Sequence, residues 1–224
     1  MLSSWGETKK ASNYHFDNLK FDKEVDKVTT LGRLIGDYSE TVKLAIENAK
    51  PATWETRGYK GEGVPPPRVD LQAEEYDLEK QGYGKDHVIS HIGWTINPQL
   101  RKISDLFGLK DCMERVHVQM PGEVWNLHID KLQKWAPEEP WRIARIFVQL
   151  TDWEPGHFWG YGNYVHTQYR AGDVLTFDWQ NLPHCTANAG HNPRVTYQLT
   201  GILTEQSNEF INRLKRFNKY DLTL

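Results

Sequence analysis

Residues 124–130, Val124-Trp125-Asn126-Leu127-His128-Ile129-Asp130, end in an alternation of apolar and polar side chains. Such alternation is typical of a strand that has one face against a core. Side chains two residues apart on a strand lie on the same face, so Asn126, His128 and Asp130 are expected side by side. The stretch therefore places an imidazole beside a carboxylate. Alone it is a weak signal, because a His-x-Asp pair also occurs on ordinary surface strands.

Other short strand-like segments lie on both sides of this stretch. Glycine, proline or asparagine separates them, as expected for strands joined by turns. The segments are residues 115–120, 142–150, 164–169, 173–179 and 194–203. Short strands at this spacing predict an all-β barrel or jelly roll.

Helices are expected on either side of the strands. Apolar residues at steps of three and four predict a long helix over residues 24–48, ended by Pro51, that covers a sheet. A second helix is predicted from an N-cap at Asn97, with Pro98 at its first position, to Gly108. In the tail, residues 207–220 have helical spacing and are expected to pack on the barrel.

We divide the chain into three parts within one domain. Residues 1–110 are expected to form a helical and loop elaboration, residues 111–205 the β core, and residues 206–224 a C-terminal helix. Residues 56–84 are rich in Gly, Pro, Tyr and charge, which predicts a long loop. Long loops serve as lids or binding segments or are disordered, and the sequence leaves these alternatives open.

Composition excludes some classes of function. The chain has 224 residues, a net charge of −3 and no block of Lys or Arg, so we expect no nucleic-acid partner. It has no apolar run long enough to span a membrane and no apolar core of signal-peptide type, which predicts a cytoplasmic protein without a membrane partner. Two cysteines make no disulfide framework. The oligomeric state stays open.

A second histidine strengthens the prediction of a metal site in the stretch of residues 124–130. His184 follows a strand-like segment and a turn, 54 residues after Asp130. Two imidazoles and one carboxylate on one face, with the remaining coordination positions open, are the ligand set of non-haem Fe(II) that activates O2. We therefore predict His128, Asp130 and His184 as metal ligands and as the catalytic centre.

Arg194 and Thr196 supply a second signal. Arg194 lies ten residues after His184, at the start of a predicted strand, and shares a face with Thr196. Arginine binds a carboxylate bidentately and a hydroxyl adds a third donor. The pair suits the distal carboxylate of a dicarboxylic cosubstrate.

Two further polar residues are candidates for cosubstrate binding. Arg145 shares a strand face with Phe147 and Gln149, so it is expected to point into the barrel. There it would hold the inner carboxylate of a cosubstrate or a substrate anion, or have a structural role. Asn126 faces the same way as the metal ligands and would hydrogen-bond cosubstrate or substrate.

Other histidines are weaker candidates. His157 and His166 compete with His184 as the distal ligand, but no Arg-x-Thr follows them, so contact with substrate suits them better. His87 and His91 are four residues apart and would share a helical face, yet they lack the His-Glu-x-x-His pattern of zinc proteases.

An aromatic segment and one cysteine complete the candidates. The segment is expected to form either a mobile wall of the substrate site or ordinary packing, and contains Trp153, Phe158, Trp159, Tyr161 and Tyr164. Cys185 is expected to face away from the metal, in the core.

In this order the motifs resemble those of the Fe(II)/2-oxoglutarate-dependent oxygenases. The resemblance covers roughly residues 115–203 and is nearest to the prolyl-hydroxylase-like and aspartyl/asparaginyl-hydroxylase-like branches. It rests on Met120-Pro121-Gly122, His128-Ile129-Asp130, the strand that begins Gly172-Asp173, His184, and Arg194-Val195-Thr196. Aspartyl hydroxylases of that type often lack the acidic ligand, whereas Asp130 is present here.

The resemblance implies a mainly β fold with flanking helices, built on a double-stranded β-helix (a jelly-roll, cupin-like barrel). It further implies Fe(II) held by His128, Asp130 and His184, and 2-oxoglutarate held by Arg194 and Thr196. The implied reaction uses O2 to hydroxylate a C–H bond of a small molecule, peptide or protein, with an amino-acid side chain favoured, and releases succinate and CO2. Two alternatives stay open: a non-catalytic or non-oxidative cupin-like module, and a metal enzyme on the same barrel that uses no 2-oxoglutarate.

Overall fold

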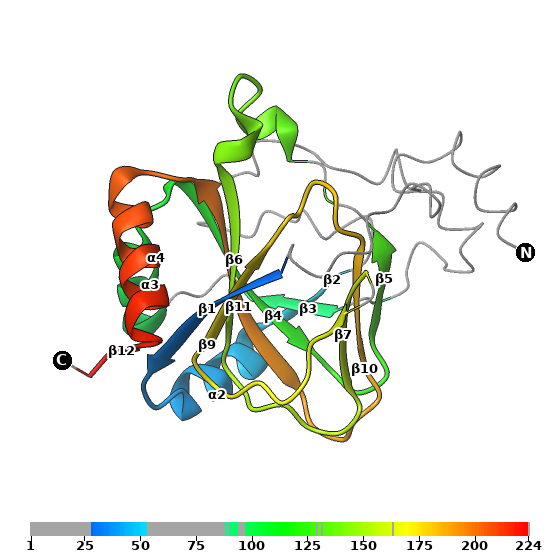
Figure 1. The fold of residues 1–224 in the computed structure, drawn as a ribbon. Helices are drawn as coiled ribbons and strands as arrows, with labels where there is room; N and C mark the ends of the chain where they lie inside the picture. Colours follow the sequence, from blue (N-terminus) through cyan, green and yellow to red (C-terminus); the bar gives the residue numbers. More distant parts are fainter. Residues whose placement is uncertain are drawn as a thin grey trace, which may run out of the picture.

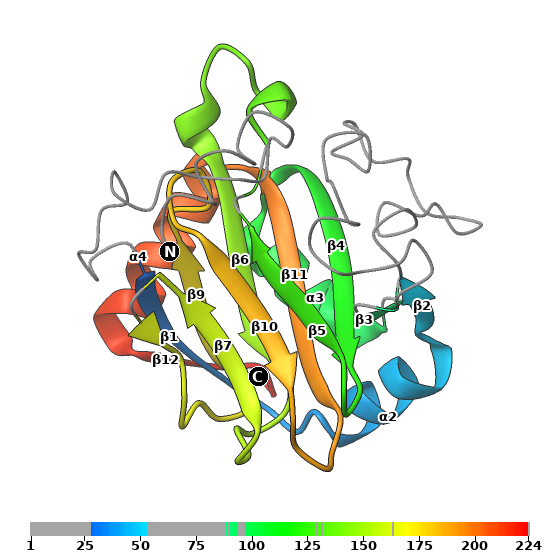
Figure 2. The same ribbon diagram turned by 90° about the vertical axis from the view of Figure 1, so that its right-hand side faces the viewer.

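The computed structural model describes residues 28–52, 88, 90–93, 97–128, 130, 132–162 and 164–223, without the side chains of Asn126 and Lys134. Two β-sheets face each other, and helices cover the outer side of one of them (Figures 1 and 2). The expected fold class, mainly β with flanking helices on a double-stranded β-helix, is confirmed. No helix in this part of the chain is long and apolar enough to cross a membrane.

The larger sheet has eight strands in the order β12-β1-β9-β6-β11-β4-β3-β2. Neighbouring strands are antiparallel, except that β1 and β12 are parallel. The strands are β1 (Val28–Ile35), β2 (Lys50–Ala52), β3 (Ser90–Gly93), β4 (Lys110–Gln119), β6 (Ile143–Gln149), β9 (Asp173–Phe177), β11 (Arg194–Ile202) and β12 (Lys219–Asp221).

The smaller sheet has four antiparallel strands in the order β5-β10-β7-β8. They are β5 (Val124–His128), β10 (His184–Asn188), β7 (His157–Tyr161) and β8 (Tyr164–Val165). Figure 2 shows this sheet in front of the central strands of the larger one. The space between the two sheets is the interior of the barrel.

In the part of the chain that the structure describes, three α-helices flank the barrel: α2 (Ser39–Asn48), α3 (Pro98–Phe107) and α4 (Glu205–Phe217). Helices α3 and α4 lie side by side on the outer face of the larger sheet (Figure 1). The main apolar core forms between helices and sheet, because Leu100, Ile103 and Phe107 of α3 pack with outward-facing residues of β4, β6 and β11. Two short 3-10 helices, η4 (Gln133–Trp135) and η5 (Pro140–Arg142), lie between β5 and β6.

Strand β11 shows how one sheet serves two environments. Its residues Val195, Tyr197 and Leu199 belong to the core beneath the helices. The alternate residues Arg194, Thr196, Gln198 and Thr200 are also buried, on the opposite face toward the smaller sheet. The barrel interior is therefore polar along this strand, which is the environment that a polar ligand or a metal needs.

The predicted helix from an N-cap at Asn97 to Gly108 is confirmed and corresponds to α3. The Asn97 side chain accepts a hydrogen bond of 2.9 Å from the backbone N–H of Leu100, and Pro98 occupies the first turn. The helix ends at Gly108, whose φ of 55° is left-handed and therefore favours glycine.

The prediction of one helix over residues 24–48 is wrong over residues 28–35. Residues 24–27 lie outside the described residues, residues 28–35 form β1, and a helix begins only at Ser39. A bulge between Thr30 and Gly32 interrupts the period-2 alternation of β1, so that Leu31 and Leu34, three residues apart, are both buried. The bulge thus produced a helix-like spacing within a strand.

Other boundaries also differ from the predictions. Residues 164–169 contain only the two-residue β8, whereas β7 and β10 were not expected. In the tail, Phe210 and Leu214 are buried as expected, but Phe217 is 59% exposed and residues 219–221 form a strand. The domain boundaries at residues 110 and 205 stay predictions, although β1, β2 and β3 pair with the central sheet. Residues 56–84 lie outside the described residues.

Candidate metal centre

His128, Asp130 and His184 meet inside the barrel at one end of the smaller sheet. His128 ends β5, His184 begins β10, and the two are direct partners in the register of these strands. Asp130 follows two residues after His128, so the three candidate ligand atoms lie within 4.8 Å of one another. All three side chains are buried. The structure thus brings together the ligand set that the spacing of the sequence predicts.

Both imidazoles turn the same nitrogen toward the carboxylate. His128 Nε2 lies 3.8 Å from one oxygen of Asp130, and His184 Nε2 lies 3.5 Å from the other. The Nδ1 atom of His184 is 3.1 Å from the carbonyl oxygen of Leu182. Because that carbonyl can only accept, Nδ1 donates and Nε2 keeps its lone pair for a metal ion.

The charge states also suit a cation. Burial lowers the pKa of His184, which favours the neutral imidazole that binds metals. Burial alone would raise the pKa of Asp130, but the charge of the neighbouring Arg145 is the largest opposing effect, and the pKa is brought to about 2. The carboxylate is therefore ionised at neutral pH.

Arg145 extends from β6 to the carboxylate of Asp130. Its Nη1 forms an ion pair with Asp130 Oδ2, and its guanidinium carbon lies 5.4 Å from the ring centroid of Phe147. Both partners of the pair are nearly buried, with 11% and 10% of their side chains exposed. The expectation that Arg145 points into the barrel is confirmed, and its contact orients one of the candidate ligands.

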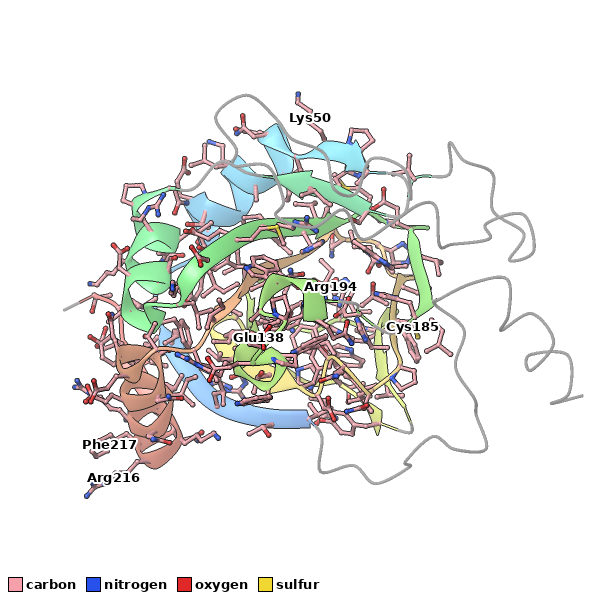
Figure 3. The ribbon with its side chains drawn as sticks, turned by 90° about the horizontal axis from the view of Figure 1, so that it is seen from above. Lys50, Glu138, Cys185, Arg194, Arg216 and Phe217 are labelled. Carbon is pink, nitrogen blue, oxygen red and sulfur yellow. The ribbon has the colours of Figure 1, made fainter. Side chains whose placement is uncertain are left out.

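Arg194 lies between the two sheets, at the start of β11 (Figure 3). Its Nη2 donates a hydrogen bond of 2.6 Å to Gln119 Oε1, and its guanidinium carbon lies 4.8 Å from the centroid of the Trp159 ring. The Tyr169 hydroxyl is a further neighbour of this guanidinium: burial raises the pKa of Tyr169, and the positive charge of Arg194 opposes that rise. Among the described residues, its Nε and Nη1 have no hydrogen-bond partner although both are buried.

Buried donors without partners imply a missing acceptor. Thr196 lies on the same face of β11 as Arg194 and donates to Gln149 Oε1 at 3.1 Å. The amide nitrogen of Gln149 has no hydrogen-bond partner in the part of the chain that the structure describes. These buried N–H groups of Arg194 and Gln149 can donate to an anion, and the assignment of Arg194 and Thr196 to a cosubstrate carboxylate stays a prediction.

No family model and no curated protein sequence matches this chain. Among solved structures it is similar to a prolyl-4-hydroxylase of Pseudomonas putida, with 15% identity over 90% of this chain and 99% of that chain and a TM-score of 0.48. It is also similar to SnoK, a non-haem α-ketoglutarate-dependent carbocyclase from nogalamycin biosynthesis, with 15% identity over 82% and 84% of the chains and a TM-score of 0.45. An oxidoreductase of the 2OG-Fe(II) oxygenase family from Burkholderia pseudomallei shares 12% identity over 89% and 90%, with a TM-score of 0.41. At such identities the likeness is one of fold.

The rival histidines do not join the cluster. His157 Nδ1 accepts from the backbone N–H of Glu154 at 3.3 Å, and its Nε2 lies 3.2 Å from the Asn192 carbonyl, so both nitrogens are used locally. His166 stacks on Tyr169, with ring centroids 5.0 Å apart. His91 lies on strand β3 and pairs with Glu123 at 2.8 Å, so a shared helical face with His87, which is not described, is wrong.

Three other expectations have mixed outcomes. Asn126 lies in β5, but its side chain is not among those described, so its role stays a prediction. In the aromatic segment, Trp159 is buried while its neighbour Phe158 is 40% exposed, because β7 turns alternate residues to opposite faces. The two alternatives for this segment, a wall of the substrate site and ordinary packing, stay open. Cys185 is only partly buried, on the outer side of β10, rather than in the core (Figure 3).

Sequence reasoning missed Gln119 and left Gln149 without a role. Both amides belong to the donor and acceptor network around Arg194 and Thr196. A signal was present in the alternation of residues 115–119, because valines at positions 116 and 118 separate three polar residues. Three buried-strand positions with polar side chains on one face indicate a polar interior.

Proposed function

We propose that this protein is an Fe(II)- and 2-oxoglutarate-dependent dioxygenase that hydroxylates an unactivated C–H bond, with succinate and CO2 as co-products. One observation carries the proposal. A buried His-Asp-His cluster shares the barrel interior with a buried arginine that has unpartnered donors. The cluster suits an open Fe(II) site, and the arginine suits an anion held near it.

His128, Asp130 and His184 would hold the metal through Nε2, a carboxylate oxygen and Nε2. Three protein ligands leave positions for cosubstrate and O2. When bound, Fe(II) couples the oxidative decarboxylation of 2-oxoglutarate by O2 to insertion of one oxygen atom into a C–H bond. The Leu182 carbonyl fixes the tautomer of His184, and Arg145 fixes the carboxylate of Asp130.

Arg194 would bind the distal carboxylate of 2-oxoglutarate, and Thr196 would add a donor if its single O–H turned from Gln149 Oε1 to that carboxylate. The arginine is held in place by Gln119 and by the face of Trp159, so little side-chain freedom remains to be lost on binding. Trp159 and Tyr161, both buried on the interior side of β7, exclude water from this region. A dry site strengthens the interaction between the guanidinium and a carboxylate.

The favoured substrate is a peptidyl or free amino-acid side chain, presented as a small molecule, a peptide or a protein. Support for this choice comes from the motif resemblance of residues 115–203 to hydroxylases of amino-acid side chains. A screen for products heavier by one oxygen atom, across peptides, free amino acids and nucleotides, tests the substrate class directly.

The cosubstrate is tested by anaerobic addition of Fe(II) and 2-oxoglutarate to the purified protein. We expect a visible metal-to-ligand absorption when 2-oxoglutarate binds. In Arg194→Ala, the affinity for 2-oxoglutarate measured from this absorption should be at least tenfold weaker. Arg216→Ala, which removes an exposed arginine on α4, is the matched control and leaves the absorption unchanged (Figure 3). An unchanged affinity in Arg194→Ala would contradict the assignment of this residue.

Turnover tests the metal ligands. Asp130→Ala and His184→Ala should abolish succinate formation, and full turnover in either variant would show that the ligands are wrongly assigned.

The two alternative functions predict different results in these assays. A cupin-like binding module would bind metal and anion without forming succinate, and a metal enzyme independent of 2-oxoglutarate would bind Fe(II) without the visible absorption.

A further inference from the structure

Three guanidinium groups belong to the inner faces of strands around the barrel interior. Arg145 and Arg194 lie on the inner faces of β6 and β11, and Arg115 on that of β4, opposite the core residues Val116 and Val118. All three charges act on His117. Its pKa is lowered to about 3, first by burial and then by the three guanidinium groups. All three guanidinium groups therefore lie near the buried His117 imidazole.

Among the described residues, Arg145 and Arg194 have one buried carboxylate partner between them, Asp130. In the part of the chain that the structure describes, the buried carboxylates are Glu123 and Asp130. Glu123 is engaged with His91 at 2.8 Å, whereas Asp130 pairs with Arg145. Under the proposed function, the two charges of Fe(II) and the two of 2-oxoglutarate cancel. A buried surplus of positive charge is costly unless an anion compensates it.

Arg145 has a free edge that can take such an anion. The guanidinium is a planar fork, and Nη1 is committed to Asp130. Its Nε is buried and has no hydrogen-bond partner among the described residues. Nε and Nη2 form the side edge of the guanidinium, whose two parallel N–H groups match the two oxygens of a carboxylate. Because Asp130 anchors the guanidinium, this edge is held beside a candidate metal ligand.

Arg145 and Arg194 define two separate anion positions. Along β11, Arg194 opposes Gln119 of β4, whereas Thr200 opposes Arg145 of β6. Six residues of strand separate these positions, about 20 Å of backbone at roughly 3.3 Å per residue. The distal carboxylate of 2-oxoglutarate is assigned to Arg194. The edge of Arg145 is therefore left for a different anion.

We propose that Arg145 binds a carboxylate of the primary substrate through its Nε–Nη2 edge, while Nη1 stays on Asp130. This inference rests on the proposed function and narrows its substrate class. The substrate is a carboxylic acid, such as a free amino acid or an acidic side chain, and not a neutral peptide segment. Binding the carboxylate beside Asp130 places the rest of the substrate next to Fe(II).

The test compares two small probes of the same shape on the protein loaded anaerobically with Fe(II) and 2-oxoglutarate. Propionate carries a carboxylate and propionamide does not. In calorimetric titrations we expect propionate to bind at least tenfold more tightly than propionamide. Arg145→Met should lose this preference, and Arg216→Met, which removes the same charge from the exposed face of α4, should retain it.

A second variant at Arg145 distinguishes loss of the guanidinium group from misfolding of the protein. Arg145→Lys keeps the charge but not the planar fork, so it should retain part of the preference for propionate, with unchanged circular dichroism. Equal binding of the two probes to the unmodified protein overturns the inference. Tighter binding of inorganic phosphate than of propionate assigns a phosphoryl group instead. Absence of the absorption before any probe is added contradicts the proposed function itself.

Discussion

Gly172 lies directly against the backbone of Leu34. The Leu34 N–H donates to the Gly172 carbonyl at 2.8 Å, and a Cβ on Gly172 would stand 2.0 Å from the Leu34 carbonyl oxygen. Gly172 also has a φ of +88°, which side chains of L-residues rarely adopt. This contact joins β1 to the turn that begins β9.

Gly172→Ala should therefore destabilise the protein more than a positive φ alone explains. We expect a loss of about 3 kcal/mol or more, because the main chain must shift to admit the methyl group. Gly122→Ala is the matched control, since Gly122 has a φ of +90° but nothing within 4 Å of its Cβ position. Its loss should be about 1 kcal/mol. Urea unfolding of both variants measures the difference, and equal losses would contradict the proposed close contact.

The buried pair of Arg145 and Asp130 should show strong coupling in the metal-free protein. Asp130→Asn leaves a buried guanidinium without its counter-charge, and Arg145→Met leaves a buried carboxylate, each at a cost of about 3 kcal/mol. The double variant removes both charges and should cost clearly less than the two single losses together. Unfolding free energies in the presence of a chelator provide the measurement. Additive losses would show that the pair does not interact.

His166 should make stability depend on pH. Burial, assisted by Arg194 and opposed by Asp173, lowers its pKa from 6.5 to about 4. Between these values the unfolded chain binds the extra proton, so stability falls as the pH decreases from about 6.5 to 4. His166→Phe keeps the stacking on Tyr169 and should reduce the loss between pH 7 and pH 4.5 by about 2 kcal/mol. Exposed His191, changed to Gln, is the control. An unaltered pH profile in His166→Phe would refute this contribution.

Asn97 links the start of α3 to α2. Its side chain accepts from Leu100 N at 2.9 Å and donates to Thr41 Oγ1 at 2.7 Å. Asn97→Ala should cost about 1–2 kcal/mol, because both bonds are lost. Asn97→Asp keeps the cap acceptor and should recover roughly half of that cost. Thermal unfolding distinguishes the two variants, and identical melting temperatures would show that the cap does not contribute.

The candidate metal ligands could be predicted from the sequence because their signal is local. His128 and Asp130 share a strand face by period-2 geometry, and His184 follows a recognisable strand and turn. The ion pair between Arg145 and Asp130 could not be predicted in the same way. It depends on how β6 is positioned behind β5 and on the path of the chain between them, which no local pattern specifies.

Two segments form elements that their sequence patterns do not predict, and each has a local physical cause. The pattern of residues 28–35 predicts a helix because a bulge in β1 leaves Leu31 and Leu34, three residues apart, both buried. Strand β10 was not expected because its residues have weak strand preference. It forms because β5 and β7 pair with it on both sides, an example of tertiary context overriding propensity.

The position of β1 has a consequence for how the chain is made. Strand β1 is bonded on one side to β9 and on the other to β12, and its ion pair between Arg33 and Asp173 joins residues 140 positions apart. During synthesis, β1 leaves the ribosome long before either neighbour exists. The nascent chain therefore carries an unpaired strand that is open to other chains, and the sheet is complete only when residues 219–221 have emerged. Newly made protein depends on late closure of this sheet for protection against aggregation.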